Sequence, residues 1–248
     1  SLKPLCNKKT LVMKKYKNTL TLGSVLLLFL LGISGCFEKP KYYPHFLTAF
    51  VEPNDFRLEA IDSDTKGRAI HPLLHEEKFV EICKIEMQGS RVEYNSYDRQ
   101  NSKIVHFLSS IGDTCYFKHT QKGGRIISRH VGIISVPKEI KVTCNTAYDK
   151  DHEKGASLND VAALSFLDNL SYIKRGYDDS FKFLAMLKMT DPMDLNRLLA
   201  SHPWWILYIK EPPTAWMDKT ITFTVSMTLS NGNTISRQVD IKIPLHSK

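Results

Sequence analysis

The stretch "TITFTVSMTLSNGNTISRQVDIKI", residues 220–243, alternates apolar and polar residues on both sides of a short polar turn. Period-2 alternation places each apolar set on one face of a strand, from Ile221 to Leu229 and again from Ile235 to Ile243. Asn231-Gly232 tolerates the positive φ that a tight type I′ turn requires. The stretch therefore predicts a β-hairpin with one buried face. Arg237 falls on the apolar phase, which predicts an edge position or a bulge there.

Other short segments share this pattern less clearly. They are rich in β-branched or aromatic residues, and polar or Gly-containing turns separate them. We expect strands at 46–52, 56–61, 78–87, 103–108, 115–119, 139–144, 181–187 and 204–210. Many short strands at roughly regular spacing favour a mainly β fold, an antiparallel β-sandwich that is immunoglobulin-like or related.

Two short helices are expected before the last strands. In "DPMDLNRLLAS", Asp191 fits the N-cap and Pro192 the first turn, which predicts a helix to about Ala200. "SLNDVAALSFL", residues 157–167, is the second candidate, with Ser157 as its cap.

The N-terminal region reads as a targeting segment. From Leu20 to Ile33 there are 14 residues, nearly all apolar, whereas a spanning helix needs about 20. Lysines precede this run, as in a secretory signal. We expect 1–12 to be an upstream extension and 13–35 a signal peptide. Residues 36–45 would form a tether and 46–248 a β-rich domain that could split near 125–135.

The end of the apolar run, "GISGC", resembles the bacterial lipoprotein box, in which an aliphatic residue and two small residues precede a Cys. The resemblance implies that Cys36 carries lipid and becomes the first mature residue, so that the chain is tethered to a membrane without crossing it. A plain signal peptide or a short uncleaved anchor is the alternative.

The formal charge of +8 does not by itself indicate nucleic-acid binding. Residues 1–35 hold six lysines and no acidic residue, which leaves 28 basic against 26 acidic residues in the mature part. No nucleic-acid-binding motif is present, so we expect no nucleic-acid partner. Cys83, Cys115 and Cys144 would remain as thiols in an oxidising compartment, where at most one disulfide can form among them.

Several stretches of the C-terminal half carry a family resemblance. They are "IKVTCNTAYDKDHEKGASLNDV", "DLNRLLASHP", "EPPTAW" and "ITFTVSMTLSNGNTI". With the leader, they resemble an uncharacterised family of Bacteroidetes lipoproteins, a domain of unknown function. The resemblance implies a mostly β-domain in a Gram-negative cell envelope and no known activity. Because "FEKPK" after the Cys holds one Glu and two Lys, the periplasmic face of the outer membrane is favoured over surface display.

Four aromatic residues near the C-terminus are candidate ligand-binding residues: Trp204, Trp205, Tyr208 and Trp216. Exposed rings there could stack on sugars. Alternation sends Trp204 and Tyr208 to one face of the strand 204–210 and Trp205 to the other. We therefore expect at least one tryptophan in the core, and core packing is the competing explanation for all of them.

The segment "NTAYDKDHEKGASLND" offers oxygen ligands for a hard cation, with Asp149, Asp151 and Glu153 as candidate metal ligands beside Asn145 and Asp160. A calcium loop would use such carboxylates, but the EF-hand order is absent. We expect no cofactor, and calcium is the alternative.

No catalytic motif stands out. Neither a Gly-x-Ser-x-Gly elbow nor a Gly-rich phosphate loop occurs. The leading hypothesis is a membrane-anchored binding or adhesion module for a glycan or a partner protein. A structural or assembly accessory of the envelope that binds through a sheet edge comes second, and a hydrolase third.

Overall fold

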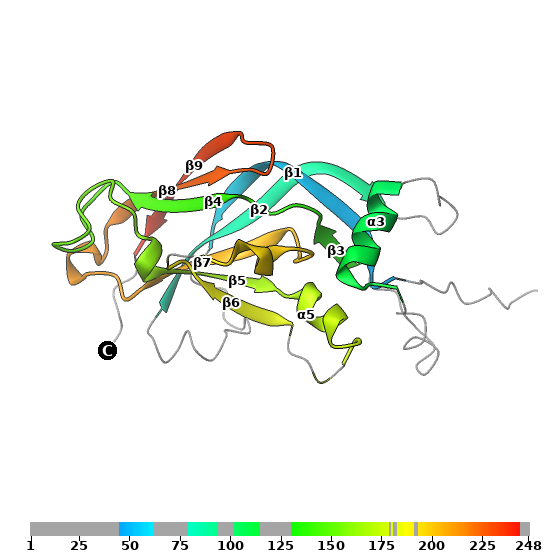
Figure 1. Cartoon of the computed structure of the whole chain (residues 1–248). Coiled ribbons are helices and arrows are strands. Elements are labelled where there is room, and N and C mark those ends of the chain that lie inside the picture. The colour runs from blue at the N-terminus through cyan, green and yellow to red at the C-terminus, as the bar shows by residue number, and fades with distance from the viewer. Residues whose placement is uncertain are drawn as a thin grey trace, which may run out of the picture. The chain divides into compact units, whose positions relative to one another are not determined.

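β-Strands dominate the structure. The computed structural model describes residues 45–61, 79–93, 102–114, 130–178, 180, 183–190 and 193–243 (Figure 1). Its strands are β1 (Leu47–Ala60), β2 (Phe79–Glu93), β3 (His130–Ile133), β4 (Glu139–Cys144), β5 (Ala162–Leu167), β6 (Leu184–Lys188), β7 (Trp204–Lys210), β8 (Thr220–Thr228) and β9 (Thr234–Lys242). The α-helices are α3 (Ser102–Ile111) and α5 (Asn169–Lys174), and 3-10 turns lie at Asn159–Val161, Leu195–Leu198 and Thr214–Trp216. Within this described part, no helix is long and apolar enough to cross a membrane.

The strands form two sheets. The larger has the order β3-β1-β2-β7-β5-β6, and the smaller has the order β4-β8-β9. β1 and β3 run parallel, and the other pairs are antiparallel. The predicted mainly β, sandwich-like fold is confirmed. All described residues belong to one compact unit.

The main core lies between the two sheets. On β8, Ile221, Phe223 and Val225 are buried while the Thr residues between them are partly exposed. Trp205 and Leu207 of β7 belong to the same apolar cluster. Burial of each such side chain stabilises the fold by roughly 1.5–3 kcal/mol. The period-2 pattern is therefore the direct cause of the sandwich.

A second core lies under the two helices, which Figure 1 shows near one another beside β3. It joins Phe46 and Phe50 to residues of α3 and α5. At its centre the buried carboxylate of Asp113 accepts hydrogen bonds from Phe46 N (2.8 Å), Leu47 N (2.9 Å) and the Tyr177 hydroxyl (2.9 Å). Burial raises the pKa of Asp113 despite these donors. This contact fixes the start of β1 against the end of α3.

The C-terminal hairpin is confirmed as β8 and β9, but its turn is not of type I′. Only Gly232 has a positive φ, at 91°, whereas a type I′ turn needs two such residues. Gly232 N donates to Leu229 O (2.9 Å) and Leu229 N to Asn233 O (2.8 Å). These bonds are typical of a type I turn closed by a left-handed glycine. Arg237 lies on the edge strand β9, as predicted, and binds Asp55 of β1 at 2.8 Å.

Most of the predicted strands are present. The segments 139–144 and 204–210 coincide with β4 and β7, whereas 46–52 and 56–61 form the single long strand β1, with an irregularity between Pro53 and Asp55. The predicted strand 115–119 lies outside the described residues. The Cys36 region and the first 44 residues also lie outside them.

Three element predictions are wrong. Residues 103–108 belong to helix α3, because Ile104, Leu108 and Ile111 share one helical face. The predicted helix 157–167 is a 3-10 turn followed by β5, whose residues are almost all buried, and such an apolar run fits a central strand as well as a helix. The helix ending near Ala200 is only the 3-10 turn Leu195–Leu198, and its proposed cap Asp191 lies outside the described residues.

Candidate functional site

The candidate site lies on the outer face of the larger sheet, along β7. Trp204, Ile206 and Tyr208 point to this face, and Trp205 and Leu207 point into the core, as alternation predicts. Trp204 is half-buried, whereas only 2% of Tyr208 is exposed. Trp204 is therefore the one ring of this strand with a face that a ligand can reach.

Two hollows adjoin Trp204. The first has a volume of about 460 Å³ and is largely apolar. Its described lining comes from β2, β5, β6 and β7: Lys84, Ser165, Leu167, Leu184, Trp204, Ile206 and Tyr208. The hydroxyl of Tyr208 donates to Glu81 Oε1 (3.0 Å), which holds this ring against β2.

The second hollow has a volume of about 390 Å³. Its described lining is more polar: Val51, Glu86, Met87, Gln88, Gly89, Arg91, Val131, His202, Pro203 and Trp204. Trp204 is the described residue that lines both hollows.

Beside the second hollow, the pairing of β7 with β2 ends at Trp204. Their register ends at Glu86 and Trp204, and one further bond follows, from Met87 N to Pro203 O (2.7 Å). The preceding segment, 200–203, then turns towards β3, where Ala200 N donates to Ile133 O and Ile133 N to Ser201 O (both 3.0 Å). Residues 202–204 therefore line the second hollow together with residues of β1, β2 and β3.

Gly89 lines the second hollow and permits the close approach of β1 to β2 there. A Cβ at this position would lie 1.9 Å from the carbonyl oxygen of Glu52, so no larger residue fits without a shift of the backbone. Gly89 therefore helps to set the shape of the second hollow.

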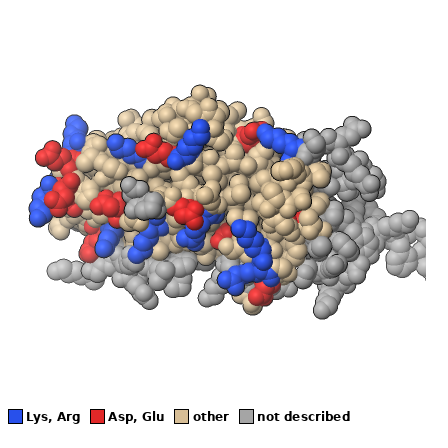
Figure 2. Space-filling model, in the orientation of Figure 1, with Lys and Arg blue, Asp and Glu red and all other residues tan. Residues whose placement is uncertain are grey.

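The charged residues around Trp204 form ion pairs with one another. Lys84 Nζ lies 3.4 Å from Glu59 and 3.8 Å from Glu86, and Arg57 lies 2.5 Å from Glu86. The hydrogen bond from Arg57 lowers the pKa of Glu86. On the far rim, Arg91 lies 3.8 Å from Glu93. On the face that Figure 2 presents, acidic and basic side chains are interspersed in the same way.

His202 contributes an uncharged imidazole. Its ring centroid lies 5.3 Å from that of Trp204, and burial lowers its pKa to about 4. Nδ1 is buried and has no hydrogen-bond partner among the described residues. The ring is therefore a neutral donor or acceptor at the edge of the second hollow.

The other two predicted aromatic residues are in the core. Trp205 is fully buried, and its Nε1 donates to Ser201 Oγ (3.0 Å). Trp216 is 2% exposed, and its Nε1 donates to Ala147 O (2.9 Å). Because both rings are enclosed and their polar atoms are bonded, neither offers a surface for stacking.

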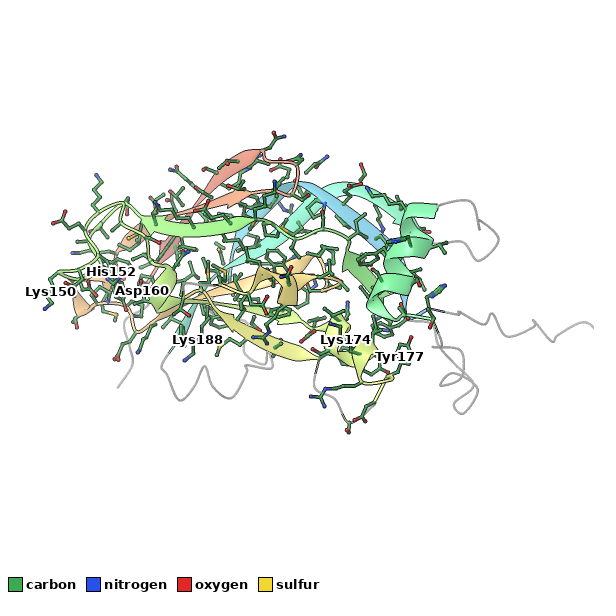
Figure 3. The ribbon with its side chains drawn as sticks, viewed as in Figure 1. Lys150, His152, Asp160, Lys174, Tyr177 and Lys188 are labelled. Carbon is green, nitrogen blue, oxygen red and sulfur yellow. The ribbon has the colours of Figure 1, made fainter. Side chains whose placement is uncertain are left out.

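The acidic loop after β4 is organised by a histidine. The His152 imidazole lies between Asp149 Oδ1, 2.7 Å from Nδ1, and Asp160 Oδ1, 2.9 Å from Nε2 (Figure 3). The hydrogen bond to Asp149 is the main reason that the pKa of His152 is raised. Asp151 and Glu153, the other predicted ligands, are exposed. In the described chain, no group of three or more His, Cys, Asp or Glu side chains could hold a metal ion.

A third hollow, of about 490 Å³, lies beside this loop. Two of its lining residues are already engaged: Asp160 binds His152, and the Asn159 side chain binds both Ile140 O (2.7 Å) and Val142 N (3.0 Å) on the edge of β4. No aromatic ring is among its described lining residues. It is therefore a weaker candidate than the hollows at Trp204.

Cys83 and Cys144 are buried free thiols, so they do not form a disulfide with each other. Burial raises the pKa of Cys83 to about 12, and it is the main reason that the pKa of Cys144 is raised. Cys115 lies outside the described residues.

Sequence reasoning found Trp204 and Tyr208 but missed Lys84, Glu86 and His202. These residues lie on β2 and on the segment before β7, and only the pairing of β2 with β7 brings them to Trp204. No local pattern in the sequence marks them.

The chain matches no protein-family model, no curated protein and no solved structure. The resemblance to Bacteroidetes lipoproteins therefore stays a prediction.

Proposed function

We propose that this chain is a lipid-anchored protein of the bacterial cell envelope whose β-domain binds a glycan. The observation that supports it best is the half-buried ring of Trp204 between two hollows that are flanked by polar side chains. The C–H face of a sugar ring packs well on an aromatic face, and its hydroxyl groups need nearby donors and acceptors. The surface around Trp204 offers an aromatic face and polar groups together.

The polar partners have suitable chemistry. Gln88 and Arg91 are exposed, and Glu86 is partly exposed beside them. Amide, guanidinium and carboxylate groups are planar and can donate to, or accept from, two neighbouring hydroxyl groups at once. His202 adds a neutral ring nitrogen on the same rim. Together they would fix the orientation of a sugar ring stacked on Trp204.

The anchor is proposed from the leader sequence. A short apolar run after lysines, followed by "GISGC", would direct lipid attachment to Cys36. Several acyl chains hold a protein at a membrane firmly, because each buried methylene group contributes roughly 0.8 kcal/mol. A tether of about ten residues would then leave the β-domain free to reach a glycan.

The anchor is tested by Cys36→Ala in the native host. We expect the variant to move to the soluble fraction and to lose metabolic labelling with fatty acid. Cys83→Ala is the matched control, because this thiol is buried in the β-domain. Unchanged membrane association and labelling of Cys36→Ala would refute the lipid anchor.

Glycan binding is tested by screening the detergent-solubilised full chain against immobilised glycans, followed by titration of the best ligand. Trp204→Ala should weaken binding at least about tenfold, equivalent to about 1.4 kcal/mol, and Trp204→Phe should retain part of the affinity. Val105→Ala, a change at an exposed apolar residue of α3, should have no effect. Equal affinities of Trp204→Ala and the parent chain would refute the proposal.

A second candidate function is an assembly role in which another envelope protein pairs with a sheet edge. The supporting observation is β9, a strand of nine residues at the edge of the smaller sheet that pairs in the described structure only with β8. Gln238→Pro on β9 should abolish such pairing, because the main chain of Gln238 faces away from β8. Purification of the chain from cross-linked envelopes as a monomer alone would count against this role.

A further inference from the structure

We infer that the ligand is an uncharged oligosaccharide that spans both hollows, with Trp204 between two of its sugar units and an apolar substituent in the first hollow. This inference rests on the proposed glycan-binding function. It adds three properties of the ligand: its length, its charge and its substituent.

The length of the ligand is inferred from the position of Trp204, which lines both hollows. Trp204 lines both hollows, and the two also meet along β2, where Lys84 of the first lies 3.8 Å from Glu86 of the second. Each hollow lies within the usual range of small-ligand sites, about 300–1,000 Å³. A single sugar on Trp204 would fill only one of them. A chain of two or more units uses both.

The absence of charge on the ligand is inferred from the ion pairs around the hollows. Among the described residues, the charged side chains that line the hollows are Lys84, Glu86 and Arg91, and each has a partner of opposite charge within 4 Å. Glu59 and Arg57 complete the group with one further charge of each sign. His202 is neutral at pH 7, because burial holds its pKa at about 4. An acidic glycan would have to break existing pairs to find a cation.

The apolar substituent of the ligand is inferred from the lining of the first hollow, which is less polar than that of the second. Apart from Lys84 and the buried hydroxyl of Ser165, the first hollow presents the carbon surfaces of Leu167, Leu184 and Ile206 beside the aromatic rings. A bare hydroxyl group would lose water there with little to replace it. The methyl group of an acetamido or 6-deoxy sugar would bury apolar surface at no such loss. The second hollow, with Glu86 and Gln88, suits the hydroxyl-bearing unit.

The experiment is a set of titrations of the full chain in mild detergent with four probes: cellobiose, N,N′-diacetylchitobiose, the monomer N-acetylglucosamine and an acidic uronic-acid disaccharide. We expect the acetylated disaccharide to bind tightest. Each methyl group buried in the first hollow should tighten binding about fourfold over cellobiose. The monomer should bind at least about tenfold more weakly. Affinity should change less than about twofold between 50 and 500 mM salt.

Two variants separate the hollows. Leu184→Ser should remove the preference for the acetylated probe, and Gln88→Ala should weaken disaccharides but not the monomer. Ser90→Ala, at an exposed neighbour on β2, is the control for folding and general surface change.

The outcomes distinguish this inference from the proposed function. If an acidic or monomeric sugar binds tightest and Trp204→Ala still abolishes its binding, the function stands and the inference fails. If no glycan binds in a Trp204-dependent way, both fail. If Trp204→Ala weakens the acetylated disaccharide, with the expected length and salt behaviour, both are supported.

Discussion

The two half-buried histidines beside the candidate site should make the protein sensitive to acid between pH 6.5 and 4. His130 stacks on Phe46 with ring centroids 3.8 Å apart, and His202 lies 5.3 Å from Trp204. Burial lowers the pKa of each imidazole to about 4, whereas an unfolded chain titrates near 6.5. The unfolded state therefore binds more protons in this interval, so the free energy of unfolding falls as pH falls.

The magnitude follows from the difference between the two pKa values. A depression from about 6.5 to about 4 corresponds to about 3 kcal/mol per ring at pH 4. Both rings keep some contact with solvent, which screens part of the charge, so we expect about 1.5 kcal/mol per ring. The rings also lower each other's tendency to accept a proton, since the charge of His130 lowers the pKa of His202. The two contributions should therefore be less than additive in a double variant.

The measurement is urea unfolding of the full chain at pH 7, 6, 5 and 4, with the free energy of unfolding from linear extrapolation. Between pH 7 and pH 4, His202→Gln should lose about 1.5 kcal/mol less than the parent chain. His106→Gln, which removes an exposed histidine of α3, controls for the loss of an imidazole as such. Parallel curves for His202→Gln and the parent would refute the assignment of acid sensitivity to His202.

Three further substitutions test the packing. Asp113→Ala removes an acceptor from two backbone N–H groups and a hydroxyl in this core. The free energy of unfolding should therefore fall by about 3 kcal/mol or more, whereas Tyr177→Phe, which removes one donor, should cost about 1 kcal/mol. Gly89→Ala forces β1 and β2 apart and should lower the thermal midpoint by several degrees, since a shift of about 2–4 °C accompanies each kcal/mol in a domain of this size. Ser90→Ala next to it should leave the midpoint unchanged. Trp205→Ala should destabilise the protein by about 3–5 kcal/mol in urea unfolding, because its ring is fully enclosed. A loss below about 1 kcal/mol for Trp205→Ala would contradict the description of the core.

The hairpin and β7 were predictable because their information is local. In residues 220–243, the alternation of apolar and polar side chains predicts both the strands and their buried face. The unbroken apolar run 204–210 predicts a buried strand. The segment 103–108 failed for the opposite reason. Its six residues are rich in β-branched and aromatic side chains, and only the extension to Ile111 reveals the helical spacing. A strand and a helix differ most clearly over ten residues or more.

The candidate site could be predicted only in part, because it is assembled by strand pairing. Alternation placed Trp204 and Tyr208 on one face, and the structure agrees. The partners Lys84 and Glu86 come from a strand about 120 positions earlier, and their place beside Trp204 depends on the register of β2 against β7. Register over such a separation depends on the whole core. No motif in the sequence encodes it.

The segment 200–203 carries local features that a purely structural connection does not need. Ala200 adopts a positive φ of 60°, which is unfavourable for a residue with a Cβ. Two residues later, His202 Nδ1 is buried without a partner in the described structure, which costs roughly 1–3 kcal/mol. A polar imidazole enclosed at this point lowers stability, and an apolar residue in its place would avoid the loss. Backbone strain and unsatisfied polar atoms gather where function constrains a chain. Both features lie within four residues of Trp204, beside the second hollow, as the proposed ligand-binding function predicts.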